Sequence, residues 1–225
     1  MLRPERYEFI LWDWNGTLLD DAWLCVDVMN GMLKERELPL RTLEQYRNIF
    51  GFPVKDYYVT LGFDFEKEPF DEVGLEFIVR YNRRQKETRL HTEVKDVLSY
   101  FQSAGYIQYI LSAREQGELS KEIADLGVQP FFSGIFGQDD HYAHGKTDVG
   151  LRLLRETGID PGKAVFIGDT EHDAEVAEEM RVDCILIPNG HHTEERLRRC
   201  KGMVVPSLTA LENLFGGHQK NQDLL

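Results

Sequence analysis

Polar residues that could do chemistry follow short apolar runs at four separated places in the sequence. They are Asp13, Ser112 with Ala113, Lys146, and Asp169 with Asp173. A carboxylate can hold a hard cation or attack phosphorus, whereas a hydroxyl, a backbone amide and an ammonium can neutralise phosphate oxygens. In such a set, Asp13 and Asp169 would share a Mg2+ ion. Ser112, the backbone amide of Ala113 and Lys146 would hold the phosphate.

Each of these residues taken alone also has an ordinary structural explanation. Ser112 is typical of a turn, and Lys146 is typical of a solvated surface. Asp169 and Asp173 are typical of acids at a helix N-terminus, where the helix dipole favours carboxylates. Their joint occurrence, in this order and at the ends of these predicted elements, is what favours a common site.

The apolar runs predict buried strands of a parallel sheet, because such strands carry nearly continuous apolar sequence. The predicted strands are 7–11, 106–111, 134–137, 164–167, 182–187 and 203–205. Amphipathic helices alternate with them, which predicts an α/β fold with a Rossmann-like parallel sheet wrapped by helices. The predicted core helices are 93–104, 115–126, 148–157, one that ends near 180, 194–200 and 208–215. The carboxyl ends of parallel strands share one edge, so the polar residues are expected to converge there.

One long segment interrupts this alternation and predicts helices only. The expected helices begin near 21 and 42, and cover 54–61 and 70–86. Thr42 and Gln45 have the spacing of a capping box. The chain is therefore expected to divide into a core domain (1–19 and 89–215), a helical cap (20–88) and a flexible polar tail (216–225). The cap would stand over the carboxyl edge of the sheet.

Composition limits the classes of function that fit the chain. Its 225 residues include 42% hydrophobic residues, which is enough for a packed core. The formal net charge of −13 argues against non-specific nucleic-acid binding, which needs a cationic surface. No run is long and apolar enough for a membrane span or a secretory signal. Three cysteines without metal-type spacing are typical of reduced thiols in a cytoplasmic protein. Nothing in the sequence indicates the oligomeric state.

The order and positions of the polar residues resemble those of the haloacid dehalogenase superfamily, and in particular its phosphoglycolate-phosphatase-like branch. The matching segments are Asp13-Trp14-Asn15-Gly16-Thr17, Leu111-Ser112-Ala113, Lys146 and Gly168-Asp169-Thr170-Glu171-His172-Asp173. The resemblance covers nearly the whole chain, and residues 20–88 match the cap of that branch. It implies a Mg2+-dependent phosphatase that acts on a small phosphorylated metabolite through an aspartyl-phosphate on Asp13.

The resemblance also implies roles for the other residues of the site. The metal site would comprise Asp13, the backbone carbonyl of Asn15, Asp169 and Asp173. The phosphate site would comprise Trp14, Asn15, Ser112, Ala113 and Lys146. The catalytic residues would be Asp13, Asn15 and Lys146. Asp173 would orient Lys146 or a water on the metal.

Asn15 departs from the family pattern, because phosphatases of this family have a second aspartate there as general acid and base. An amide forms hydrogen bonds but cannot protonate a leaving alkoxide, and loss of acid–base help costs about 10²–10⁴-fold in rate. Aryl phosphates, acyl phosphates and anhydrides have better leaving groups and need an acid less. Glu171 or His172 could replace the acid, and deamidation of Asn15 would restore an aspartate.

Three other functions are alternatives to a phosphatase. A catalytically weak member that binds Mg2+ and a phosphorylated ligand as a regulatory protein is favoured by Asn15 and opposed by the retention of Asp13 and Lys146. A 2-haloacid dehalogenase would lack both the Gly16-Thr17 pair and the acid-rich fourth motif. A phosphonate hydrolase would carry a small apolar residue in place of Asn15.

Two further pairs of residues remain open at this stage. His191 and His192 follow the fifth predicted strand, where a solvated loop is favoured over a metal role. Arg83 and Arg84 on a predicted cap helix could contact an anionic substrate or form a solvated face. The three tryptophans are expected to pack around the first motif and the cap hinge; they are Trp12, Trp14 and Trp23.

Overall fold

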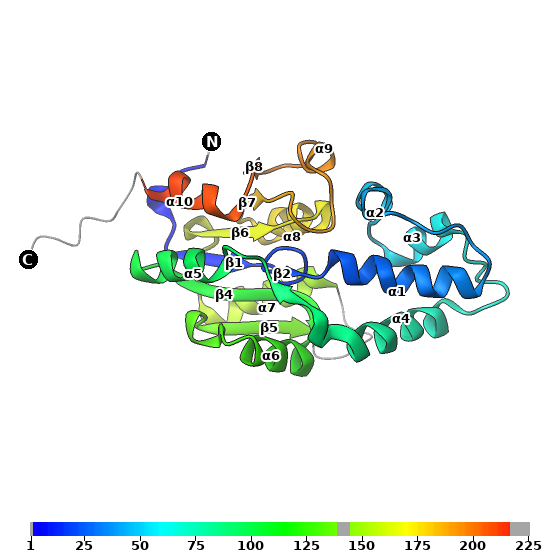
Figure 1. Ribbon diagram of the computed structural model, residues 1–225. Coiled ribbons are helices and arrows are strands. Elements are labelled where there is room, and N and C mark those ends of the chain that lie inside the picture. The colour runs from blue at the N-terminus through cyan, green and yellow to red at the C-terminus, as the bar shows by residue number, and fades with distance from the viewer. Residues whose placement is uncertain (1, 139–144, 217–225) are drawn as a thin grey trace, which may run out of the picture.

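The core of the protein is a six-stranded, wholly parallel sheet with the strand order β5-β4-β1-β6-β7-β8. A computed structural model describes residues 2–138 and 145–216 of the chain, so residues 217–225 of the predicted tail lie outside the described part. The strands are β1 (Phe9–Trp12), β4 (Ile107–Glu115), β5 (Gly134–Gln138), β6 (Ala164–Gly168), β7 (Asp183–Leu186) and β8 (Met203–Val204). The predicted α/β fold with a Rossmann-like parallel sheet is confirmed (Figure 1).

Helices cover both faces of this sheet, and the remaining helices form a group beside it (Figure 1). Those of the core are α5 (Val94–Ser103), α6 (Gln116–Asp125), α7 (Lys146–Thr157), α8 (Glu171–Met180), α9 (Glu194–Leu197) and α10 (Leu208–Gly216). Those of the group beside it are α1 (Ala22–Glu35), α2 (Leu43–Ile49), α3 (Val54–Leu61) and α4 (Phe70–Arg84).

Alternation along the central strands divides the core into two apolar layers. Ile10 and Trp12 of β1 pack with α5, α6 and α10 on one face, whereas Leu11 packs with α7 and α8 on the other. All three side chains are fully buried. Because successive strand residues point to opposite faces, a strand covered on both sides must be apolar throughout. This is why the sheet is recognisable in the sequence as unbroken apolar runs.

Three details of the core differ from the prediction. The strand expected to end at Leu111 continues to Glu115, because after a register shift Glu115 pairs with Gln138 of β5. The helix expected from Asp148 already begins at Lys146, with Gly145 as its N-cap. The structure also contains a short antiparallel ribbon, β2 (Leu19–Asp20) with β3 (Arg89–Leu90), which the sequence did not predict. Strands of two residues are too short to show any periodicity.

The helices α1–α4 lie between β2 and β3 in the chain and have an apolar cluster of their own. Leu24, Met32 and Tyr58 are among its buried members. Thr42 caps α2 in the predicted capping box: its hydroxyl accepts from the Gln45 amide, and the Gln45 side chain accepts from the Thr42 amide. Figure 1 shows this group at the end of the molecule where β1 runs out towards α1. The helices therefore stand beside the carboxyl edge of the sheet.

Candidate active site

Three of the predicted site residues meet in a buried ionic cluster at the carboxyl edge of the sheet. The ammonium of Lys146, in the first turn of α7, donates to Oδ1 of Asp13 and, at 2.5 Å, to Oδ1 of Asp173. Asp13 follows β1 directly, and its backbone amide donates to the Ile167 carbonyl of β6 at 2.9 Å. Each of the three charged residues is at most 5% exposed. Lys146 therefore links two carboxylates from different elements, one directly after β1 and one in the first turn of α8.

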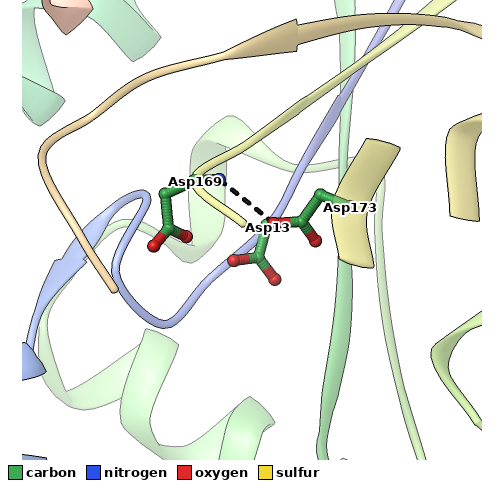
Figure 2. Close-up of side chains that lie close together, drawn as sticks. All are labelled: Asp13, Asp169 and Asp173. Atoms are coloured by element: carbon green, nitrogen blue, oxygen red, sulfur yellow. Dashed lines mark hydrogen bonds between the residues drawn. The ribbon is translucent and has the colours of Figure 1, made fainter. Parts of the chain in front are cut away.

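Asp173 is held in place by the N-terminus of its own helix. The Thr170 hydroxyl accepts from the Asp173 amide, while Oδ2 of Asp173 accepts from the amides of Asp169 and Thr170, at 3.1 and 2.9 Å. Figure 2 shows the Asp173 carboxylate beside Asp13, with the bond from the Asp169 amide dashed. Asp173 thus acts both as a helix-capping acid and as the partner of Lys146. The structural and the functional interpretation of this residue both apply.

Asp169 lies next to this cluster and is fully buried. Its carboxylate accepts from the Thr17 hydroxyl at 2.8 Å and from the His191 amide at 2.6 Å. Thr17 also donates weakly to Asp13, at 3.2 Å. The first and fourth motifs are therefore joined by hydrogen bonds, as expected for residues at the ends of the neighbouring strands β1 and β6.

The charges of this cluster are not balanced by the chain alone. Burial raises the pKa of Asp13 well above its usual range, and the nearby Asp173 and Asp169 carboxylates add to this rise against the attraction of Lys146. Burial likewise raises the pKa of Asp169. Burial also acts to raise the pKa of Asp173, but Lys146 and Thr170 outweigh it and the pKa is lowered. The cluster therefore contains three buried carboxylates, and the Lys146 ammonium contacts those of Asp13 and Asp173.

This donor set fits a divalent cation. One oxygen from each of Asp13, Asp169 and Asp173 lies within 4.8 Å of the others. Hard carboxylate oxygens are the ligands that Mg2+ takes in proteins, and a second positive charge would lower the raised pKa values of Asp13 and Asp169. The residues present therefore suit Mg2+.

The turn after Asp13 brings Asn15 against the first residues of the helical group. Its Nδ2 donates to Oδ2 of Asp21 at 2.8 Å and to the Tyr81 hydroxyl at 3.1 Å. Asp21 also accepts from the Gly16 amide at 2.9 Å and from the Tyr81 hydroxyl at 2.7 Å. Asp21 was not among the predicted site residues, since an acid just before a helix looks like an ordinary N-terminal residue. The amide of Asn15 is thus directed to Asp21 and Tyr81.

The prediction of a solvated loop at His191 and His192 is wrong. His191 is 6% exposed: its Nε2 lies 3.3 Å from Asp21 and its Nδ1 2.7 Å from the Tyr46 hydroxyl of α2. Burial acts to lower the pKa of His191, but the Asp21 carboxylate raises it to about 9. The loop is buried because α2 covers it, and Arg47 of α2 donates to the carbonyls of Gly190 and Asn189.

His192 points the other way and is 1% exposed. Its Nδ1 accepts from the Glu171 amide at 3.0 Å, and burial, with the Arg196 cation nearby, lowers its pKa to about 4. The Glu171 carboxylate is itself paired with Arg196 and does not line the cavity described below. Glu171 is therefore poorly placed to replace the missing acid. His172 does line that cavity, with its ring stacked on Phe52 at 4.6 Å between centroids.

The remaining predicted phosphate-binding residues lie in two kinds of position. Ser112 is buried and lines the cavity beside the exposed Ala113, and its hydroxyl accepts from the Arg114 amide at 3.2 Å. The Trp14 indole is fully buried and donates to Glu122 at 2.9 Å, so only the backbone of Trp14 could serve a phosphate.

A cavity of about 740 Å³ opens between the acidic cluster and the helices α1–α4. Asp13, Asn15 and Lys146 line its inner end. Arg84 pairs instead with Asp27 and Glu87, and neither it nor Arg83 lines the cavity. These two arginines therefore fit the predicted solvated face better than a contact with substrate.

The fold, with its acidic cluster at the carboxyl edge of the sheet, defines an α/β protein with a Rossmann-like core and a helical insertion after the first strand. Residues 10–187 match the family model described as haloacid dehalogenase-like hydrolase. The chain belongs to this family and is a hydrolase. Within the described residues, no helix has the length and apolarity needed to cross a membrane.

Similar proteins come from several bacteria. A phosphoglycolate phosphatase of Pseudomonas savastanoi is 23% identical over 91% of this chain and 78% of its own. An N-acetylmuramic acid 6-phosphate phosphatase of Pseudomonas putida is 24% identical over 84% of this chain and 87% of its own. A solved structure of a haloacid dehalogenase-like hydrolase from Streptococcus pneumoniae has a TM-score of 0.79 and 23% identity, and covers 93% of this chain and 99% of that one. These likenesses agree with the resemblance drawn from the motifs.

Proposed function

We propose that the protein is a Mg2+-dependent phosphatase that acts on a small phosphorylated metabolite through an aspartyl-phosphate on Asp13. The observation that carries this proposal is the buried contact of Lys146 with both Asp13 and Asp173, at the inner end of a cavity. A carboxylate nucleophile, and an ammonium that neutralises phosphate charge and is held by a second carboxylate, are groups that suit such a transfer. The names of the bacterial relatives support a phosphate ester as substrate.

The chain's own residues divide the work of binding and transfer. Asp13 attacks phosphorus, and Lys146, fixed by Asp173, holds the charge of the phosphoryl oxygens as they pass through the transition state. Ser112 and the Ala113 amide bind the same oxygens from the second half of β4. Asp13, Asp169, Asp173 and the Asn15 carbonyl would hold Mg2+, which supplies positive charge to the phosphate when bound.

Asn15 supplies no proton in this scheme. Its amide is engaged by Asp21 and Tyr81, and an amide has no titration near neutral pH. The leaving group therefore receives no proton from position 15. We place residues 20–88 as the cap that encloses this step and the protein in the cytoplasm, where its three free thiols are stable.

Phosphate release from 4-nitrophenyl phosphate with Mg2+ tests the proposal. Release by the native protein that is abolished by chelator and by Asp13→Asn supports chemistry at Asp13. Release that persists in Asp13→Asn at the native rate would overturn it. Trapping of the phosphoryl group on Asp13, located by peptide mass spectrometry after acid quench, gives an independent readout.

A second candidate is a catalytically weak member that binds Mg2+ and a phosphorylated ligand as a regulatory protein. The engagement of Asn15 with Asp21 and Tyr81 favours it, because the position of the usual acid is then purely structural. This candidate predicts saturable binding of Mg2+ and phosphate, measured by calorimetry, with no release from any ester. Gain of release on Asn15→Asp would then identify an intact site that lacks only its acid.

A further inference from the structure

The outer part of the cavity has an aromatic wall, formed by Phe50, Phe52, Tyr57, Phe70, Phe77 and Tyr81. These rings come from α3, from α4 and from the loop that joins α2 to α3. Phe50 contacts both Phe52 and Tyr57 edge-on, with centroids 5.4 and 5.3 Å apart, and Phe77 stacks on Tyr81. Leu75 and Ile78 of α4 continue this lining although they are 58% and 37% exposed. Apolar side chains that remain open to solvent inside a cavity indicate an apolar occupant.

The outer part of the cavity also has no free lysine or arginine among the described residues, and its one basic ring, His172, is stacked on Phe52. Among the described residues that line it, Lys146 and Arg114 are the only lysine or arginine. Lys146 lies at the inner end, and Arg114 is occupied: it lies 3.4 Å from Glu122, donates to Gln85 and covers the Tyr81 ring at 5.3 Å. Asp71 and Glu72, in the first turn of α4, line the same region. A negative charge placed there would be desolvated beside acidic groups, without a lysine or arginine to pair with it.

Asn15 sets a second, independent requirement on the same part of the substrate. Because no acid stands at this position, the bond from phosphorus to the leaving oxygen must break without protonation of that oxygen. An aryl oxygen tolerates this far better than an alkyl oxygen, because the ring delocalises the negative charge. The aromatic wall and Asn15 therefore select for the same chemical group.

We propose that the substrate is an aryl phosphate whose ring carries no negative charge, and that the aromatic wall binds this ring while the phosphate lies against Lys146. This proposal rests on the phosphatase function proposed above. In the first step an Asp13 oxygen bonds to phosphorus and the aryl oxygen leaves with the electron pair as a phenolate. In the second step a water oxygen bonds to phosphorus and Asp13 is released. Of the two protons of that water, one ends on the phenol and the other on the phosphate.

A matched set of esters tests the selection directly. The Mg2+-loaded protein is given phenyl phosphate, 4-carboxyphenyl phosphate and 2-phosphoglycolate, and kcat/KM is measured for each. The carboxylate of the second ester improves the leaving group slightly, so chemistry alone favours it over phenyl phosphate. We expect phenyl phosphate to exceed it by about tenfold or more, since a buried unpaired charge is costly. Equal or greater kcat/KM for 4-carboxyphenyl phosphate would overturn the proposal while leaving the phosphatase function intact.

A pair of variants on α4 provides the control within the chain. Ile78→Lys places a cation in the lining, whereas Val79→Lys places one on the same helix at a residue that is 47% exposed and outside the lining. Ile78→Lys should raise kcat/KM for 4-carboxyphenyl phosphate relative to phenyl phosphate by about tenfold. Val79→Lys should leave the ratio unchanged. An equal change in both variants would show a general charge effect and would contradict a role for the wall.

A binding measurement covers the case in which no ester is hydrolysed. Benzylphosphonate and 4-carboxybenzylphosphonate resemble the two aryl esters but cannot be cleaved. Calorimetry with Mg2+ should give a Kd at least about tenfold lower for benzylphosphonate, and Ile78→Lys should reduce this difference. Tighter binding of the carboxylate by the native protein would overturn the proposal. Tighter benzylphosphonate binding without turnover of any ester would support a site that prefers an uncharged ring. It would contradict only the phosphatase function.

Discussion

The side-chain amide of Asn15 donates to the Asp21 carboxylate, with Nδ2 2.8 Å from Oδ2. The bond joins the turn after the first strand to the residue that precedes α1. It also explains why an amide suits this position. Burial acts to raise the pKa of Asp21, but His191, Asn15 and Tyr81 lower this pKa to about 2. A carboxylate at position 15 would face a permanently charged neighbour.

Asn15→Asp should therefore gain activity and lose stability together. Repulsion from Asp21 should raise the pKa of the new carboxyl, so that it can donate a proton to a leaving alkoxide. We expect hydrolysis of an alkyl phosphate such as glycerol 3-phosphate to rise by about 10²-fold or more. The melting temperature should fall, and Asp21→Asn added to the variant should restore much of it. A melting temperature that Asp21→Asn fails to raise would mean that the two side chains do not meet.

Lys146→Met should remove activity and destabilise the protein, because Asp13 and Asp173 lose their shared cation. Breaking a buried ion pair costs roughly 3–5 kcal/mol of unfolding free energy. Urea unfolding at pH 7 with chelator measures this loss, and added Mg2+ should recover part of it. Lys163→Met is the control, since Lys163 pairs with Glu8 at the surface and little change is expected. Similar losses in the two variants would argue against a strained acidic cluster.

Gly16 and Gly127 allow a matched test of how closely the backbone at Gly16 approaches Asp169 in the proposed Mg2+ site. Both have a positive φ, +78° and +71°, so Gly→Ala at either position should cost about 1–2 kcal/mol of stability. A Cβ at Gly16 would lie 2.4 Å from Oδ2 of Asp169, whereas one at Gly127 meets nothing within 4 Å. Gly16→Ala should therefore weaken Mg2+ binding at least about tenfold in calorimetry, since misplaced ligands cost affinity on that scale. Gly127→Ala should bind Mg2+ as the native protein does.

The two neighbouring histidines should give opposite dependences of stability on pH. The pKa of His191 is raised to about 9, so its contribution is complete below about pH 6.5 and is lost as the pH rises through 9. The pKa of His192 is lowered to about 4, so its contribution is present above about pH 6.5 and is lost as the pH falls towards 4. With chelator present, His191→Gln should flatten the fall in unfolding free energy between pH 7 and 9. His192→Gln should keep that alkaline fall and reduce the acidic one.

The sheet and the inner end of the site could be predicted from the order of residues alone. Asp13 and Asp169 could be placed together because buried parallel strands are apolar without interruption, which marks where β1 and β6 end. Ser112 was placed with them by the same apolar pattern, although β4 continues past it to Glu115. The carboxyl ends of such strands share one edge whatever the details of packing. The same argument foresaw Lys146 in the cluster, although it missed that α7 begins at this residue.

Only the tertiary structure decided what surrounds this cluster. His191 reads as a loop residue because the loop's own sequence is polar, yet it is buried by Tyr46, a residue 145 positions away. The direction of the Asn15 amide, the pairing of Arg114 with Glu122 and the aromatic wall likewise depend on how α1–α4 pack beside the sheet. Local periodicity reports which face of an element is apolar, whereas these contacts are set by long-range packing between elements. The residues of the acidic cluster are therefore predictable from the chain, whereas the contacts that surround them form only on folding.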